Sequence, residues 1–405
     1  MAVLPFIHLF MKNNSYSLSY IRVLYAMWLV RTVLSYLLTY RKSLLIADQK
    51  EYIASITGLI LNVVSYLAII LLVTWEQNYL LALGIGTVTE VVLNIWISWY
   101  VEQKYPFLRQ RRKEKSTSSL TKRIVRDLKS LFISRISEKM LYCTDNLIIS
   151  GFIGVGTVGR YANYCMITQA ISNILTILAN TIQPTVGDYF TEKNHQRNYE
   201  ILRQLTFGFF CIASVVSIGL FSLITPFVRD IWLGPSYELG WGITVLCIVV
   251  LLVRIMGLPL SLVMGVTGLF EKEKNVGASS ALLNLIVSLA LVKPYGMAGV
   301  LLGTLLSYLL QIVYRYIIYF RDFLEMPGEA LRYAQDIGEY LAVIAGEVLL
   351  MQKIVPLVYG AGGMLLFCVC FLLCIAIPLL LDLVIFGRGW RLQSIITMVK
   401  GMRKA

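Results

Sequence analysis

The sequence predicts an all-α polytopic membrane protein with about eleven transmembrane helices. Hydrophobic residues make up 58% of the 405 residues and charged residues only 15%, whereas soluble domains carry roughly 25% charged residues. Apolar runs and basic connections alternate along the chain. The helices are expected to form two parallel-repeat lobes plus two C-terminal helices.

The apolar runs have the length of transmembrane helices. Runs of about 20 residues suit a hydrocarbon core roughly 30 Å thick, and a lipid-exposed backbone must satisfy its own hydrogen bonds as a helix. The segment Met1 to Phe10 is apolar but too short, so it is expected to be the end of a helix whose beginning is absent. The expected spans are 18–40, 53–75, 78–101, 130–153, 158–183, 204–227, 241–267, 275–293, 296–319, 335–357 and 362–386.

The positions of Lys and Arg predict the orientation. Ten basic residues lie between Lys104 and Lys129, and the other basic connections fall on the same side of the predicted topology, as does the C-terminal tail. The positive-inside rule assigns these loops and the tail to the cytoplasm. The net charge of +13 is therefore a topology signal beside anionic lipid headgroups, and no nucleic acid partner is expected.

The sequence gives no sign of a cofactor or metal site. All seven cysteines fall in predicted spans, where a thiol behaves as a small hydrophobe, and no CxxC pair is present. His8 and His195 lie apart from the cysteines.

Charged side chains inside the spans are the informative residues, since each one facing lipid costs roughly 2.5–3.5 kcal/mol. The span 130–153 contains several of them at helical spacing on one predicted face: Arg135, Glu138, Lys139, Asp145 and the polar Asn146. That face must look into protein or water. An internal salt bridge and the lining of a cavity explain it equally well.

Two further arginines indicate an internal repeat. Trp28-Leu29-Val30-Arg31 and Leu251-Leu252-Val253-Arg254 are each followed, 18 residues after the arginine, by a polar segment and then two more apolar spans. Both copies run in the same direction, as in transporters built from parallel repeats. The expected parts are a remnant of an N-terminal lobe (1–103), a basic linker (104–129), a six-helix lobe (130–325), and two extra spans with a basic tail (326–405).

Three segments resemble polysaccharide flippases of the multidrug/oligosaccharidyl-lipid/polysaccharide exporter superfamily. They are Ser43 to Tyr52, Thr144 to Tyr164 and Tyr295 to Thr304, and the similarity extends roughly from Leu4 to Phe320. The resemblance implies two lobes of six helices, often with two more, that move lipid-linked oligosaccharides across the bacterial cytoplasmic membrane. It also implies that about three N-terminal helices of the family pattern are missing from this sequence.

The expected function is therefore a transporter, not an enzyme, that acts on a polyprenyl-pyrophosphate-linked oligosaccharide by alternating access. A coupling cation is a further candidate partner beside the membrane lipids. Basic side chains would bind the pyrophosphate and amides the sugar hydroxyls. The candidate cavity residues are Arg31, Arg135, Glu138, Lys139, Asp145, Asn146, Asn163 and Arg254. A cation-coupled multidrug exporter of the same superfamily is the alternative, and a membrane-embedded polymerase or acyltransferase is a second one.

Overall fold

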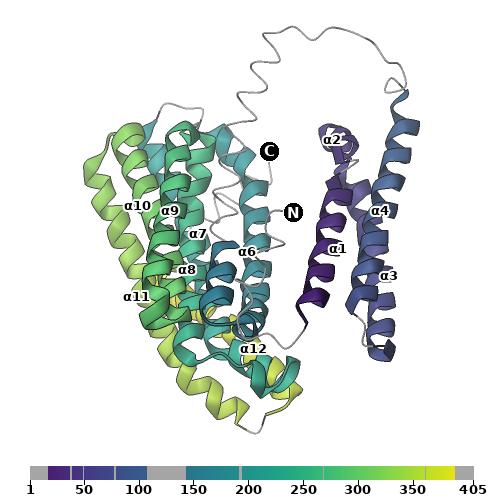
Figure 1. Ribbon diagram of the computed structural model, residues 1–405. Helices are drawn as coiled ribbons and strands as arrows, with labels where there is room; N and C mark the ends of the chain where they lie inside the picture. The colour runs from purple at the N-terminus through teal and green to yellow at the C-terminus, as the bar shows by residue number, and fades with distance from the viewer. Residues whose placement is uncertain are drawn as a thin grey trace. The chain divides into compact units, whose positions relative to one another are not determined.

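The computed structural model describes residues 17–36, 39–48, 50–76, 79–106, 143–190, 194–267, 269–360 and 362–387. The chain divides into two compact units, Met1–Val125 and Arg126–Ala405. Helices dominate both units (Figure 1).

The described part of the first unit contains four helices. These are α1 (Leu18–Tyr36), α2 (Thr39–Ala47), α3 (Glu51–Glu76) and α4 (Tyr79–Lys104). Helix α4 packs against each of the other three. Leu45, Ala54, Ile97 and Val101 form the small buried core of this unit.

The second unit begins, within the described residues, with a helical segment over 143–152. It continues through α6 (Val155–Tyr189), α7 (His195–Pro226), α8 (Trp241–Val266), α9 (Phe270–Tyr295), α10 (Met297–Ile318), α11 (Pro327–Tyr359) and α12 (Met364–Phe386). Short helical turns extend α7 (Phe227–Trp232) and α10 (Tyr319–Leu324), and a further turn, Pro235–Tyr237, precedes α8.

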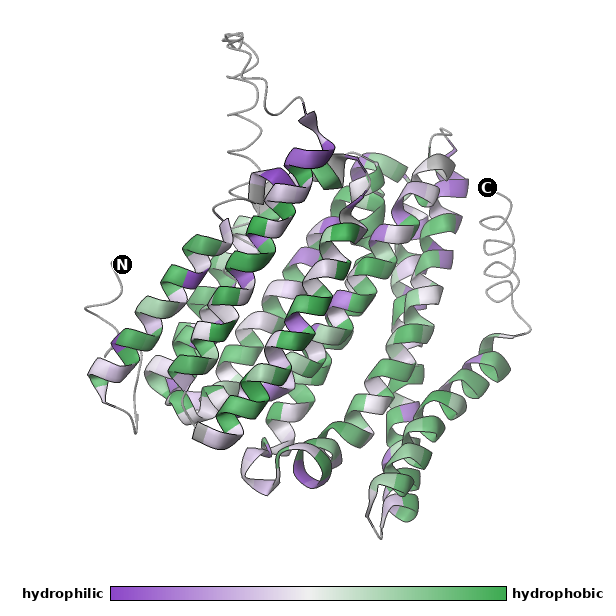
Figure 2. Cartoon of the chain, turned by 90° about the vertical axis from the view of Figure 1, so that its right-hand side faces the viewer, coloured by the Kyte–Doolittle hydropathy of each residue, from purple (hydrophilic) through white to green (hydrophobic). Residues whose placement is uncertain are grey.

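The predicted membrane character is confirmed in the described part of the chain. Nine helices there are long and apolar enough to cross a membrane, and they coincide with nine of the eleven predicted spans. Hydrophobic residues cover these helices along most of their length (Figure 2). On α3, Leu59, Val63 and Leu71 are more than half exposed, as expected for side chains that face lipid.

The other two predicted spans have different outcomes. The span 18–40 corresponds to α1, which ends at Tyr36 and is followed by the separate short helix α2. This division precedes the basic residues Arg41 and Lys42, which do not suit a hydrocarbon environment. The span 130–153 lies outside the described residues up to position 142.

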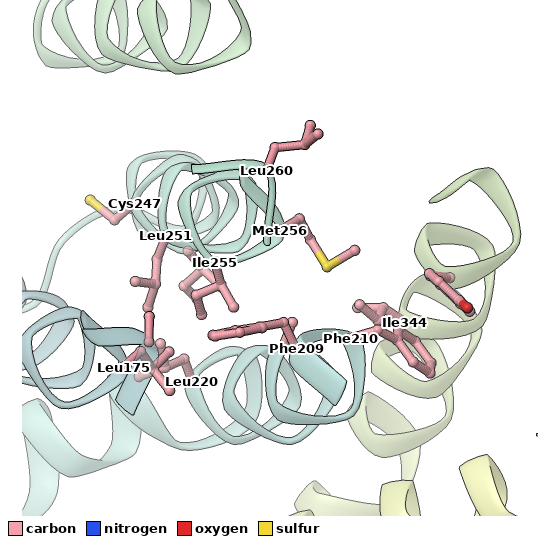
Figure 3. Close-up of a cluster of buried hydrophobic side chains, with 14 of the residues drawn as sticks. Leu175, Phe209, Phe210, Leu220, Cys247, Leu251, Ile255, Met256, Leu260 and Ile344 are labelled. Carbon is pink, nitrogen blue, oxygen red and sulfur yellow. The ribbon is translucent and has the colours of Figure 1, made fainter. Parts of the chain in front are cut away.

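The core of the second unit centres on α7 and α8. Ile255 and Met256 of α8 lie next to Phe209 of α7, and Leu251 points toward Leu175 and Leu220 (Figure 3). Ile344 of α11 lies beside α7 at Phe210. Helices α11 and α12 both pack on α7. The two C-terminal helices are therefore part of the core of this unit.

Contacts between distant residues give the helix directions. Residues 203 and 336 are paired, and so are 214 and 347, both with a separation of 133. A constant separation means that α7 and α11 run parallel. In the first unit, the pairs 31–90 and 41–102 likewise show that α4 runs parallel to α1 and α2. Both relations agree with the alternation of spans expected from the sequence.

The same packing order occurs twice. In the first unit α4 packs against α1 and α3, and in the second unit α10 packs against α8 and α9. These triplets include the two arginine-containing segments, and the internal repeat itself stays a prediction. Each third helix contacts both helices that precede it.

Candidate functional site

Arg31 lies on α1 against α4. Its guanidinium Nη2 is 3.6 Å from the Glu90 carboxylate, and both side chains are about one-third exposed, at 36% and 33%. A Cβ added at Gly86 would stand 2.8 Å from Arg31 Nη1. The glycine on α4 thus provides the space in which the arginine lies beside Glu90. Arg31 was predicted from the sequence as a cavity residue, but its acidic partner Glu90 was not.

Polar side chains of α2, and of the residues that follow it, form hydrogen bonds and ion pairs with the C-terminal part of α4 and with Tyr105. Arg41 pairs with Glu102 at 2.6 Å and donates to Ser98. Asp48 accepts hydrogen bonds from Lys50 and Tyr105. These two donors lower the pKa of the Asp48 carboxyl below its ordinary value.

Asp48 and Lys50 belong to the segment Ser43 to Tyr52, one of the three that carry the family resemblance. Their exposed interactions lie in the connection after the first span. The segment Ser43 to Tyr52 therefore includes the connection between α2 and α3, and Asp48 in it is hydrogen-bonded to Tyr105, which follows α4.

Asp145 is a buried carboxylate at a junction of three helices. It is 5% exposed and accepts a hydrogen bond from Thr304 of α10 at 2.7 Å. Asn284 of α9 donates to Asp145 at 3.5 Å and to Thr304 Oγ1 at 2.9 Å. The buried Asn284 Oδ1 has no hydrogen-bond partner, so the cluster presents several oxygen acceptors and no basic group of its own.

Small residues make this junction possible. A Cβ at Gly303 would lie 2.3 Å from Ser288 Oγ and 3.0 Å from the Ser288 backbone nitrogen. Ser288 donates to the Val300 carbonyl, and Gln311 donates to Ser280. Helices α9 and α10 therefore approach so closely that their polar side chains bond across the interface, as is common for small residues in membranes.

The remaining candidates in the second unit have different environments. Asn146 is exposed although it follows the buried Asp145. Asn163 is half-buried on α6 and donates to the Gly159 carbonyl of its own helix. Arg254 is half-buried on α8. The hydrogen-bond donors to Asp145 are Asn284 and Thr304, and neither was among the residues predicted from the sequence.

Three candidates, Arg135, Glu138 and Lys139, lie outside the described residues. The choice between an internal salt bridge and a cavity lining on that helical face therefore stays open for them. Of that face, the structure describes only Asp145 and Asn146 among the selected residues.

Buried charges on the C-terminal helices were also missed. Arg203 of α7 forms a two-point pair with Asp336 of α11, with distances of 2.6 and 3.0 Å. Glu347 of α11 and Asp382 of α12 are each 4% exposed. All three acids lie within the predicted spans 335–357 and 362–386 or at their edge, so the rule applied to the span 130–153 would have found them.

Comparisons with known proteins give the family context. Residues 1–190 match the family described as polysaccharide biosynthesis protein. Among solved structures, the lipid II flippase MurJ in an inward closed conformation is similar, with a TM-score of 0.68 and 14% sequence identity. The similarity covers 95% of this chain and 80% of that chain. Among curated proteins, no match was found.

These similarities agree with the sequence-based expectation of an all-α polytopic membrane protein. The resemblance to polysaccharide flippases is thereby supported by the family match over residues 1–190 and by the similarity in fold. The chain has the sequence pattern of polysaccharide biosynthesis proteins over residues 1–190 and the fold of a lipid II flippase.

Proposed function

We propose that this protein flips a lipid-linked oligosaccharide across the bacterial cytoplasmic membrane by alternating access. The observation that carries the proposal is the agreement between the polysaccharide family match and a flippase fold that extends over 95% of the chain. The substrate class is a polyprenyl-pyrophosphate-linked sugar, whose anionic headgroup cannot cross hydrocarbon without compensating contacts.

The arginines inside the spans suit this headgroup. A guanidinium carries five donors in a fixed fork that matches phosphate oxygens. The 3.6 Å separation between Arg31 and Glu90, and the partial exposure of both, leave donors of Arg31 available. Arg254 stands at the corresponding point of the second copy. We assign pyrophosphate contacts to these two residues and to Lys139, with Arg135 at the cytoplasmic entrance.

The Asp145 junction is the proposed site for a coupling cation. The carboxylate, the free Asn284 Oδ1 and the Thr304 hydroxyl supply oxygen ligands in one buried place. Oxygen donors are the ligands that hard cations prefer. Glu138 is assigned an accessory role in setting the local charge, and the amides of Asn146 and Asn163 are assigned to the sugar.

The orientation is part of the same proposal. The basic connections and the C-terminal tail lie in the cytoplasm, following the positive-inside rule. The parallel directions of α7 and α11 support the alternation on which this assignment depends.

A flipping assay with the protein reconstituted into vesicles tests the substrate contacts. The double variant Arg31→Ala/Arg254→Ala removes two charge-assisted contacts, each worth about 1.5–3 kcal/mol, so transport of a pyrophosphate-linked sugar lipid should fall at least roughly tenfold. Arg332→Ala is the control, since the Arg332 side chain is 69% exposed and pairs, among the described residues, with Glu329 one turn away. Equal transport by the double variant and the control would remove both arginines from the site.

The multidrug exporter alternative makes a different prediction in cells. Deletion of the gene should abolish a surface polysaccharide and leave drug tolerance unchanged if the proposal holds. Loss of drug tolerance with normal surface polysaccharide would favour the alternative.

A further inference from the structure

Helices α11 and α12 bring two acidic side chains together inside the second unit. Glu347 lies in the middle of α11 and Asp382 near the end of α12, and each is 4% exposed. Both helices pack against α7 as well as against each other. The mutual packing of α7, α11 and α12 therefore places two buried carboxyl groups in one three-helix region.

The hydrogen bonds of this pair are incomplete. Ser214 of α7 donates to Glu347 Oε2 at 2.7 Å. The second oxygen of Glu347 and both oxygens of Asp382 are buried without a hydrogen-bond partner. Buried carboxylate oxygens in native proteins almost always have such a partner, so three oxygens lack a ligand that this site would normally require.

Among the described residues, no basic side chain pairs with either acid. Within the described part of the chain, neither residue takes part in a salt bridge. The basic residue of α7 nearest in sequence to Ser214 is Arg203, which lies three turns earlier and is held by Asp336. Among the described residues, the Cys211 thiol of α7 also lies near the pair.

The surroundings are apolar on the side toward the start of α7. Phe210 stacks on Tyr340 with a centroid distance of 4.4 Å, and Phe386 meets both rings edge-on. Phe386 follows Asp382 by one turn, and Phe210 precedes Ser214 by one turn. The aromatic residues therefore separate the carboxyl pair from the Arg203–Asp336 pair.

Two ionised carboxylates in such a place would repel each other and would both lack solvation. One proton removes one of the two negative charges and converts an acceptor oxygen without a partner into an O–H donor. We propose that Glu347 and Asp382 together bind one exchangeable proton, so that the two C-terminal helices form a proton-binding site with α7.

A proton fits this site better than a metal ion does. The described neighbours provide two carboxyl groups and the Ser214 hydroxyl, and a single proton is enough to remove the repulsion between the two acids. Among the described residues there is no cluster of three or more acidic, cysteine or histidine side chains that could hold a metal. The proposal does not depend on the transported substrate, and it assigns a role to α11 and α12.

Infrared difference spectroscopy of the purified protein in lipid tests the proposal without a transport assay. The carbonyl band of a protonated carboxyl should be present at neutral pH, should move when water is replaced by D₂O, and should titrate away at high pH. In difference spectra against wild type, Glu347→Gln and Asp382→Asn should each lose or shift this band. Glu339→Gln, an exposed acid on the same helix, should leave it unchanged.

The neutral double variant Glu347→Gln/Asp382→Asn guards against misfolding, because it leaves no buried charge. It should fold, and its thermal stability should depend less on pH than that of wild type. The proposal is overturned if both single variants keep the wild-type band, or if adding sodium chloride at constant pH removes the band and thereby identifies a sodium site.

Discussion

Arg203 and Asp336 show how a charge is retained within the helical bundle. Their side chains are 21% and 9% exposed, and two parallel hydrogen bonds join them between α7 and α11. The guanidinium also lies over the Tyr199 ring, 5.5 Å from its centroid. Charge pairing, hydrogen bonding and stacking together compensate for the loss of water.

Removal of one partner should therefore be costly. Asp336→Ala leaves Arg203 without its acceptor, and breaking a buried pair in this way costs about 3–5 kcal/mol. The more exposed pair of Arg332 and Glu329 should lose less than about 1 kcal/mol when Arg332 is replaced by alanine. Denaturant unfolding in detergent measures both. Equal losses would show that the Arg203–Asp336 pair behaves as a surface pair.

At the scale of single residues, the sequence predicted that Asp145 is shielded from lipid but did not predict its hydrogen-bond partners. Asp145 was expected to face away from lipid because an intramembrane carboxylate is costly there, and it is buried. Its partners Asn284 and Thr304 are 139 and 159 residues away. No local pattern reports such a contact, because it depends on how the helices pack.

Helices were predicted well wherever their length is set by the membrane. Nine spans agree with the structure because apolar length is a local property of the sequence. The separate helix α2, whose first residues fall within the predicted span 18–40, was missed. The close approach of α9 and α10 was also missed, although Gly299, Gly303 and Ser307 recur every four residues.

The contact between α9 and α10 gives a prediction for the helix pair. Gly303→Ala would place a methyl group against Ser288 and within 3.1 Å of the Asn284 carbonyl, so the helices must separate at a cost of about 1–3 kcal/mol. Gly208→Ala on α7 is the control, because nothing lies within 4 Å of its added Cβ. The control should be neutral or slightly more stable. Thermal unfolding compares them, and unchanged stability of Gly303→Ala would contradict this account of the packing.

On the scale of the whole molecule, the topology can be tested with single cysteines. Helix α7 has 32 residues and is about 48 Å long, which exceeds the hydrocarbon thickness of roughly 30 Å. In a variant without the seven native cysteines, a cysteine at the exposed position 236 should react with an impermeant thiol reagent added to intact cells. A cysteine at the exposed position 196 should react only after permeabilisation. The reverse pattern would invert the proposed orientation.

The boundary between the two compact units lies close to one of the boundaries expected from the composition of the sequence. The compact units meet between Val125 and Arg126, within a few residues of the end of the basic linker expected at 104–129. The assignment of the other boundaries stays a prediction. The repeat was predicted because the two arginine-containing segments share a local sequence, and it stays a prediction. The attachment of α11 and α12 to α7 depends on contacts that local sequence does not encode.

The seam of glycine and serine between α9 and α10 restricts how this protein changes shape. Where the two backbones are this close, no flexible side chains lie between them that could adjust to a shift of one helix. Helices α9 and α10 must therefore move together as one rigid body. Rearrangement has to occur along interfaces filled by larger, adaptable side chains, such as the one between α7 and α8. Spin labels on α9 and α10 should therefore keep one constant separation throughout the cycle, while labels that span α7 and α8 report the movement.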